Sequence, residues 1–254
     1  MEEVQTEQKA STNESFVSTW ERSVFGCVNG MLFYDFIYPI ILLIFIQLIL
    51  GANYASTIEA HQYTIQLILS LLTSIVTLIV GIIIAIPSKI IKAFKLPKLD
   101  DFKLMLSTLL LIIGVTIGYN LLMTLCGVNV GSGNENQTAI VEYIKNAAFL
   151  SFVTFVLVGP VLEEVTYRYF LFGGLRKLNP KLAIIFSGFI FMLIHGTVGF
   201  ISDGSNFLKE IILLPPYMFS GCMLAYAYNK SENLAVSTGA HMLNNLISFI
   251  LSVL

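Results

Sequence analysis

The chain has 254 residues, of which 56% are hydrophobic and only 12% are charged, and its formal net charge is −2. Soluble domains are about a quarter charged, so a water-soluble globule of this composition would lack the polar residues that coat a protein surface. Disordered chains are much less apolar, and nucleic-acid-binding domains are strongly basic. The composition excludes these classes and predicts an all-α fold, a polytopic bundle of transmembrane helices in a lipid bilayer that binds no nucleic acid.

Residues 1–23 are predicted to form a polar N-terminal tail. This segment opens with Glu2, Glu3 and Glu7, whereas a cleavable signal peptide has a basic start that is followed at once by an apolar stretch. Residues 24–254 are predicted to form a single membrane-embedded domain.

A transmembrane helix requires about 20 mostly apolar residues. We expect about seven such spans, within a range of six to eight, because proline can interrupt a helix at Gly159-Pro160 and at Pro215-Pro216. The expected spans are Met31–Leu50, Tyr63–Ile86, Phe102–Cys126, Ala147–Phe172, Leu182–Ile201, Ile211–Tyr228 and Leu234–Leu254.

The distribution of basic residues indicates the orientation. Lysine and arginine accumulate in cytoplasmic loops. If the tail is cytoplasmic, most of the 14 basic residues fall on the cytoplasmic side, including the cluster at Lys89–Lys103. We therefore expect a protein of the cell membrane whose N-terminus is cytoplasmic.

Several polar side chains fall inside the expected spans. Each ionisable group there costs about 3 kcal/mol at the bilayer centre on insertion scales, so such groups are rare. They gather in the fourth, fifth and seventh spans, which form a core at about residues 147–254. At about 1.5 Å per helical residue, they share one layer roughly 10–20 Å below the cytoplasmic face. This layer is the predicted active site. The residues are Glu163, Glu164, Arg168, His195, His241 and Asn245.

Helix geometry predicts different surroundings for the two adjacent glutamates. Glu164 and Arg168 are four residues apart, so they can form an ion pair along one helix face, and such a pair can be purely structural. Glu163 points about 100° away from Glu164 and is left free to face a cavity.

The same spacing connects each histidine to a neighbour. His241 and Asn245 are four residues apart, so both can point at one reacting centre. Phe191 precedes His195 by four residues, which predicts an aromatic ring beneath the imidazole. A single intramembrane histidine is often only a hydrogen-bonding partner between helices, but the shared depth of these residues favours one site.

These residue types are suited to hydrolysis. A carboxylate and a histidine can activate water, while a second histidine and an amide can donate hydrogen bonds to a developing oxyanion. Glu163, His195 and His241 are alternatively a set of ligands that zinc accepts. Both arrangements predict hydrolysis of a carbonyl compound, with a peptide bond as the expected substrate. Asp35 and His61 are predicted to be solvated and to take no part.

Three patterns together resemble the signature motifs of the CPBP family, the CAAX proteases and bacteriocin-processing enzymes that are also called the Abi family. The resemblance covers about residues 158–247. The patterns, in chain order, are Glu163-Glu164-x-x-x-Arg168, Phe191-x-x-x-His195 and His241-x-x-x-Asn245.

The resemblance implies an intramembrane endopeptidase with a cavity open to the cytoplasm and a membrane-associated peptide or protein as substrate. By position, Glu163 would activate water with the help of His195. Oxyanion stabilisation would fall to His241 and Asn245, and organisation of the site to Glu164 with Arg168. Members are often called metalloproteases, and a metal-free mechanism is also proposed for them, so the role of zinc is open. Bacterial members are linked to bacteriocin maturation, self-immunity and peptide signalling.

Two other classes of function are compatible with an apolar helical chain. A non-catalytic membrane partner, such as a bacteriocin immunity protein or a regulator of a sensor kinase, is the alternative to an enzyme. A small transporter would be expected to contain paired inverted halves, which this sequence lacks. The sequence predicts no oligomeric state.

Overall fold

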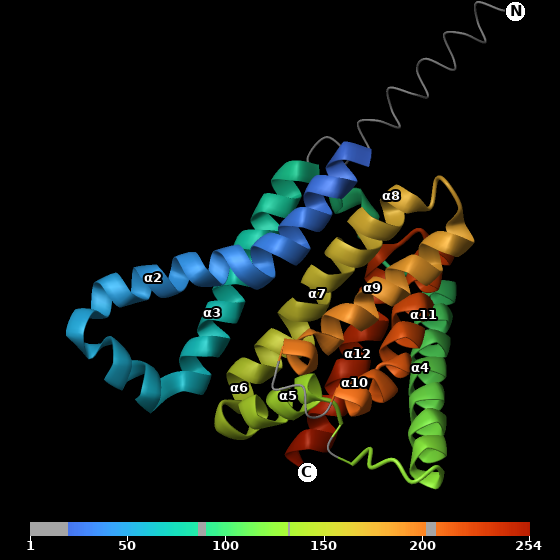
Figure 1. Ribbon diagram of the computed structural model, residues 1–254. Coiled ribbons are helices and arrows are strands. Elements are labelled where there is room, and N and C mark those ends of the chain that lie inside the picture. The colour runs from blue at the N-terminus through green and yellow to red at the C-terminus, as the bar shows by residue number, and fades with distance from the viewer. Residues whose placement is uncertain (1–19, 86–89, 132, 202–206) are drawn as a thin grey trace, which may run out of the picture.

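The computed structural model describes residues 20–85, 90–131, 133–201 and 207–254, and these residues form helices without strands (Figure 1). The predicted all-α class is confirmed. Elements η1, η5 and η6 are π-helical, and η2 and η4 are short 3₁₀ turns. The elements are η1 (Asn29–Ile37), α2 (Tyr38–Leu50), η2 (Gly51–Asn53), α3 (Tyr54–Ala85), η4 (Ile90–Ala93), α4 (Leu99–Leu125), α5 (Glu135–Asn146), α6 (Ala148–Ser151), η5 (Phe152–Val158), α7 (Gly159–Glu163), η6 (Glu164–Phe172), α8 (Gly173–Leu175), α9 (Pro180–Ile201), α10 (Phe207–Leu213), α11 (Pro215–Ser231) and α12 (Leu234–Val253).

Six helical stretches in the described residues are long and apolar enough to cross a membrane, within the predicted range of six to eight. The protein is therefore a multi-pass membrane protein. The first stretch, Trp20–Ile83, has 64 residues and contains the first two expected spans. It holds both because the chain turns at Gly51, whose positive φ of 52° favours glycine, and again at His61, where α3 is kinked. Helices α2 and α3 consequently form a hairpin that extends away from the other helices (Figure 1).

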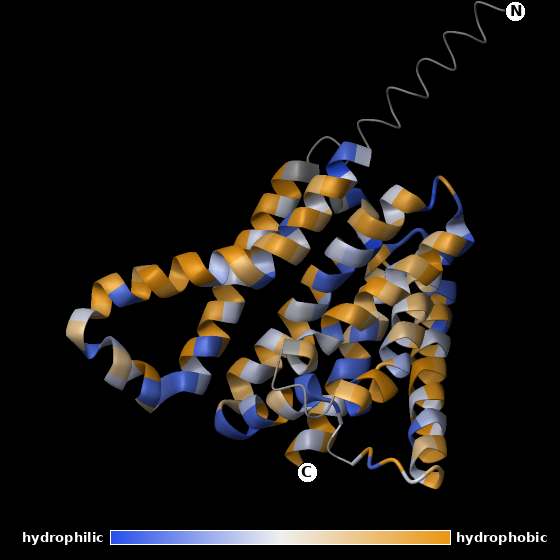
Figure 2. Ribbon diagram, viewed as in Figure 1, coloured by the Kyte–Doolittle hydropathy of each residue, from blue (hydrophilic) through white to orange (hydrophobic). Residues whose placement is uncertain are grey.

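The surfaces of the hairpin and of α4 are suited to lipid. Hydrophobic residues run along α2 and α4 (Figure 2), and the side chains of Leu48 and Ile49 at the end of α2 are 76% and 66% exposed. A continuous apolar surface of this kind is unfavourable in water, and it indicates contact with the hydrocarbon region of the bilayer.

The motif-bearing helices pack closely in one bundle. Helix α11 lies against α9, α4 and α12 (Figure 1). Gly188 on α9 and Gly221 on α11 meet where a Cβ on either residue would overlap the opposite helix. Small residues allow this close approach, which matters in lipid because hydrophobic burial contributes little to helix association there.

The fourth expected span is not split at Gly159-Pro160. A continuous helical stretch runs over Ala148–Leu175, with the short helix α7 between the π-helical elements η5 and η6. Pro160 occupies the first turn of α7, directly after the wide π-helical turns. Proline lacks the N–H group that would donate a helix hydrogen bond, and the wider turns before it accommodate this loss. Turns of this kind are frequent at functional sites. Glu163 ends α7 and Glu164 begins η6.

The expected break at Pro215-Pro216 is present. Helix α10 ends at Leu213 and α11 begins at Pro215, where proline is tolerated because the first N–H groups of a helix have no partner within it. The stretch Phe207–Ser231 is nevertheless long enough to count as one candidate span.

Most of the expected polar tail, residues 1–19, lies outside the described residues. Trp20–Ser23, which the sequence assigned to the tail, begin a helix that continues into η1. Small residues of this helix pack against η6 and α8. The two segments run antiparallel, because residues further along this helix contact residues that come earlier in η6 and α8. The contacts pair Ser23 with Gly174, Gly26 with Phe170, and Gly30 with Thr166.

Candidate active site

A buried ion pair lies at the centre of the candidate site. Arg168 Nε is 3.2 Å from Glu164 Oε2, and both side chains are fully buried. The second oxygen of this carboxylate, Oε1, is 3.0 Å from His241 Nδ1. The ion pair predicted from the sequence spacing is therefore present, and Glu164 also connects its own helix to α12.

Glu163 points away from the ion pair, as the helix geometry predicted. Its side chain is 29% exposed, and its Oε2 atom lies 3.8 Å from His241 Nε2. In the described part of the chain this oxygen has no hydrogen-bond partner. Because 3.8 Å exceeds hydrogen-bond length, both atoms keep their capacity to bind a water molecule.

Hydrogen-bond acceptors indicate where His241 carries its proton. The carboxylate of Glu164 is paired with Arg168 and accepts hydrogen bonds, so His241 Nδ1 is the donor. The other ring nitrogen, Nε2, is the one that faces Glu163. The imidazole thus lies between a buried, ion-paired carboxylate and a partly exposed one.

His195 is held between two aromatic rings. Its Nδ1 is 2.8 Å from the carbonyl oxygen of Phe191, which can only accept, so the neutral ring leaves Nε2 as a free lone pair. The ring of Phe191 is 4.3 Å away between centroids, which agrees with the predicted aromatic neighbour. Tyr217 of α11 stacks on the imidazole at 4.6 Å.

The ring of Phe191 brings the three motifs together. The Arg168 guanidinium lies 4.6 Å from its centroid, and the His241 ring lies 5.7 Å away. His195 is also close enough to Glu163 and His241 to interact with both electrostatically. Arg168, His195 and His241 therefore gather around one aromatic side chain, although they come from three separate helical segments. Glu163 and Glu164 lie beside the His241 ring.

Asn245 is placed differently from the other five. Its amide nitrogen Nδ2 donates to the carbonyl oxygen of Phe155 at 2.9 Å, and its oxygen accepts a 3.4 Å bond from Asn244. The acceptor is a π-helical carbonyl of η5. One of the two amide hydrogens is thus engaged with the backbone, and the oxyanion role of Asn245 stays a prediction.

The predicted zinc ligands fit a metal only in part. The Nδ1 atoms of His195 and His241 face a carbonyl and a carboxylate, as in many metal-bound histidines, and their Nε2 atoms are available. However, no group of three His, Cys, Asp or Glu side chains among the described residues is arranged to hold a metal ion. Glu163 and the two histidines do not form a closed ligand set here, and zinc binding stays a prediction.

Two residues behind His195 were not predicted from the sequence. Asn134 is the N-cap of α5, where its Oδ1 accepts from Gln137 N at 3.0 Å, and its Nδ2 donates to the carbonyl oxygen of His195 at 3.1 Å. The Tyr217 hydroxyl donates to the same Oδ1 at 3.2 Å. Asparagine three residues before glutamine is a recognisable helix start, but its contact with α9 is long-range.

Glu210 is a third residue whose contact was not predicted from the sequence. It is fully buried, and its Oε1 accepts a 2.9 Å hydrogen bond from the backbone N–H of Glu135, the first residue of α5. A carboxylate at this place stabilises the positive end of a helix dipole. The start of α5 is therefore held by hydrogen bonds to both α9 and α10.

The stacking of Tyr217 on His195 gives a testable prediction. Tyr217→Leu removes the ring and is expected to change the imidazole nitrogen NMR signals of His195, whereas Tyr217→Phe keeps the ring and is expected to preserve them. Loss of the hydroxyl alone should cost about 1 kcal/mol of stability. The spectrum is simple because the chain has three histidines. Unchanged His195 signals in Tyr217→Leu would show that the ring does not position the imidazole.

Two comparisons with known proteins found similar proteins. Residues 145–247, which include all six predicted site residues, match the family described as type II CAAX prenyl endopeptidase Rce1-like. The chain is also 30% identical over 125 residues to the "Putative membrane peptidase YdiL" of Bacillus subtilis (strain 168). This alignment covers 49% of the chain and 46% of that relative, so the chain matches about half the length of its curated relative. No solved structure matches the chain.

The family match falls on the part of the chain that carries the three motifs, and both matches are to proteins described as membrane peptidases or CAAX endopeptidases. The resemblance that the motifs predicted is therefore confirmed: the motif-bearing region is similar to CAAX-protease-like membrane peptidases of the CPBP family.

Proposed function

We propose that this protein is an intramembrane endopeptidase that hydrolyses peptide bonds of a membrane-associated peptide or protein by means of a water molecule activated by glutamate and histidine. One observation carries the proposal: the His241 imidazole lies between the partly exposed Glu163 and the buried, ion-paired Glu164. The similarity to a membrane peptidase and to CAAX endopeptidases supports it. The site belongs to the cytoplasmic half of the cell membrane in this proposal.

Water activation follows from the free atoms of two side chains. A water molecule beside Glu163 Oε2 gives its proton to this carboxylate, and the lone pair on His195 Nε2 accepts the second hydrogen and orients the water. The water oxygen then bonds to the carbonyl carbon of the peptide. General bases in such positions accelerate reactions by about 10²–10⁴-fold.

The negatively charged oxygen of the tetrahedral intermediate needs a hydrogen-bond donor. When both of its ring nitrogens carry hydrogen, His241 donates from Nδ1 to Glu164 and from Nε2 to the oxyanion. The second amide hydrogen of Asn245 is a further donor in this proposal. When the carbon–nitrogen bond breaks, the proton held by Glu163 moves to the leaving nitrogen, which completes hydrolysis.

The test compares new peptide termini in membranes. Cells that express the wild-type chain are expected to contain cleaved membrane-protein termini, identified by mass spectrometry, that are absent with His195→Ala and His241→Ala. The control is His61→Ala, which changes the remaining, exposed histidine in the hairpin. All variants are checked for equal amounts in the membrane. If the variants of His195 and His241 produce the wild-type termini, the enzyme proposal is wrong and a non-catalytic membrane partner is favoured.

The same purified proteins decide the zinc hypothesis. Ligation by Glu163, His195 and His241 predicts about one zinc ion per chain by elemental analysis and its loss from both histidine variants. A wild-type protein that cleaves after chelation, without bound zinc, would support the metal-free mechanism.

A further inference from the structure

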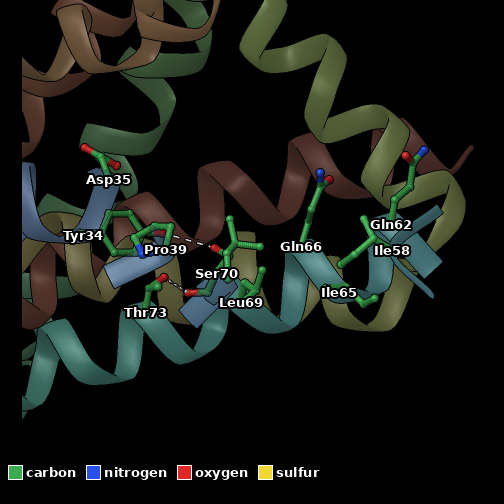
Figure 3. A pocket seen from close by; sticks show the side chains of 11 residues that line it. Tyr34, Asp35, Pro39, Ile58, Gln62, Ile65, Gln66, Leu69, Ser70 and Thr73 are labelled. Carbon is green, nitrogen blue, oxygen red and sulfur yellow. Dashed lines mark hydrogen bonds between the residues drawn. The ribbon is translucent and has the colours of Figure 1, made fainter. Parts of the chain in front are cut away.

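A groove of about 350 Å³ lies along the hairpin between η1, α2 and α3 (Figure 3). The apolar part of its lining comes from α2 and α3. This combination of an apolar wall and a few polar groups is typical of ligand sites. The polar residues that line it are Tyr34, Asp35, Gln62, Gln66, Ser70 and Thr73.

Asp35 is the charged residue of this groove. It lies inside the continuous helix formed by η1 and α2, not near a helix end as the sequence indicated. Among the described residues it has no ion-pair or hydrogen-bond partner, whereas its neighbour Tyr34 hydrogen-bonds to Ser70 and Ser74. A carboxylate within a membrane span is costly, and such groups usually have a partner or a function.

The groove adjoins the proposed catalytic carboxylate. Gly30 of η1 lies against Thr166 of η6. Because the two helices are antiparallel, the residue three positions further along η1 lies opposite Glu163. Asp35 follows Gly30 by five residues, so its position along the helix axis is within about one helical turn of Glu163. The two carboxylates are close enough to interact electrostatically.

The polar groups on the α3 side can bind a peptide backbone. The Gln66 side-chain oxygen accepts a 2.8 Å hydrogen bond from the Tyr143 hydroxyl. Burial, with a smaller effect from Tyr63, raises the pKa of Tyr143, so the phenol stays protonated and remains the donor. The amide NH₂ of Gln66 and the side chain of Gln62 are then available to an extended peptide, and the apolar wall can hold apolar side chains.

We propose that this groove is a substrate subsite that binds an extended, mostly apolar peptide segment, with Asp35 as the counter-ion of a lysine or arginine side chain. The inference rests on the proposed function, since the subsite presents a segment to Glu163. Charge distinguishes a peptide from a lipid as the occupant. A lipid acyl chain would contact the apolar wall but leave the Asp35 carboxylate unpaired. An apolar peptide with one basic side chain contacts the wall and also pairs with the carboxylate.

The test measures peptide binding, so it does not depend on hydrolysis. The full-length protein carrying Glu163→Gln is placed in nanodiscs of zwitterionic phosphatidylcholine. Two fluorescent apolar peptides, identical except for one lysine replaced by the uncharged norleucine, are titrated and followed by anisotropy. Empty nanodiscs supply the lipid background. The lysine peptide is expected to bind at least tenfold more tightly than the norleucine peptide.

Variants of Asp35 then test the counter-ion directly. Asp35→Asn is expected to reduce the preference to less than twofold, and Asp35→Lys to prefer a peptide with glutamate at the same position. Asp100→Asn, which changes a carboxylate that is 92% exposed and outside the groove, is the matched control and should leave the preference unchanged. Equal binding of the lysine and norleucine peptides, or a lysine preference that persists in Asp35→Asn, would overturn the subsite. The proposed function would be unaffected, because it is tested separately by cleavage.

Discussion

Replacing Glu163 with glutamine is expected to lower the rate of peptide-bond hydrolysis by about 10²–10⁴-fold, the usual contribution of a general base. Glutamine has nearly the same shape as glutamate but cannot accept a proton from water. Stability should change little, because Oε2 of Glu163 has no hydrogen-bond partner among the described residues and its side chain is 29% exposed. The loss is therefore expected in the rate of the chemical step, with peptide binding retained.

The measurement compares cleavage rates of one substrate by proteins in equal amounts in the same lipid. Glu59→Gln is the matched control, since Glu59 is exposed on α3 in the outer part of the hairpin. It should cleave at the wild-type rate. If Glu163→Gln also retained wild-type activity, Glu163 could not be the group that accepts the water proton, and the division of roles between the two glutamates would be wrong.

The contacts that could be predicted from the sequence are those between residues of the same helix. Glu164 with Arg168, and Phe191 with His195, are four residues apart, and helical geometry alone brings such pairs together. The number of spans was similarly predictable from apolar lengths. These features depend on distances of one or two helical turns, which the order of residues determines directly.

Contacts between helices were less predictable. The bond from Glu164 to His241 joins residues that are 77 positions apart, and only their common depth pointed to it. Asn245 was expected to face the site, but a π-helical carbonyl at Phe155 engages its amide. No periodic pattern in the sequence indicates which carbonyl a π-helical turn will offer.

The N-terminal helix shows a second limit of sequence reasoning. Gly26 and Gly30 were not assigned a role, yet they allow the helix to contact η6 and thereby bring Asp35 towards Glu163. Small residues carry little signal in a hydropathy profile. Their importance follows from the backbone distance between two helices, which emerges only in the folded bundle.

The buried ion pair should be the strongest single contribution of a side-chain charge to stability in this site. Arg168→Met is expected to destabilise the protein by about 3–5 kcal/mol, because it leaves the Glu164 carboxylate buried without its cation. Methionine can still pack on the ring of Phe191, which lies 4.6 Å from the guanidinium. The loss measured should therefore be mainly electrostatic.

A double variant separates the effect of the unpaired Glu164 charge from the effect of lost packing. Glu164→Gln combined with Arg168→Met removes both charges, and the glutamine oxygen can still accept from His241 Nδ1, so the double variant should be clearly more stable than Arg168→Met alone. Lys103→Met is the control, since it breaks an ion pair whose side chains are 68% and 92% exposed, and it should cost less than about 1 kcal/mol. Unfolding in detergent can be followed by thiol labelling of the partly buried Cys27 and Cys222. If the single and double variants unfolded at the same temperature, the cost would come from lost packing, and Glu164 would not need the arginine to remain buried beside His241.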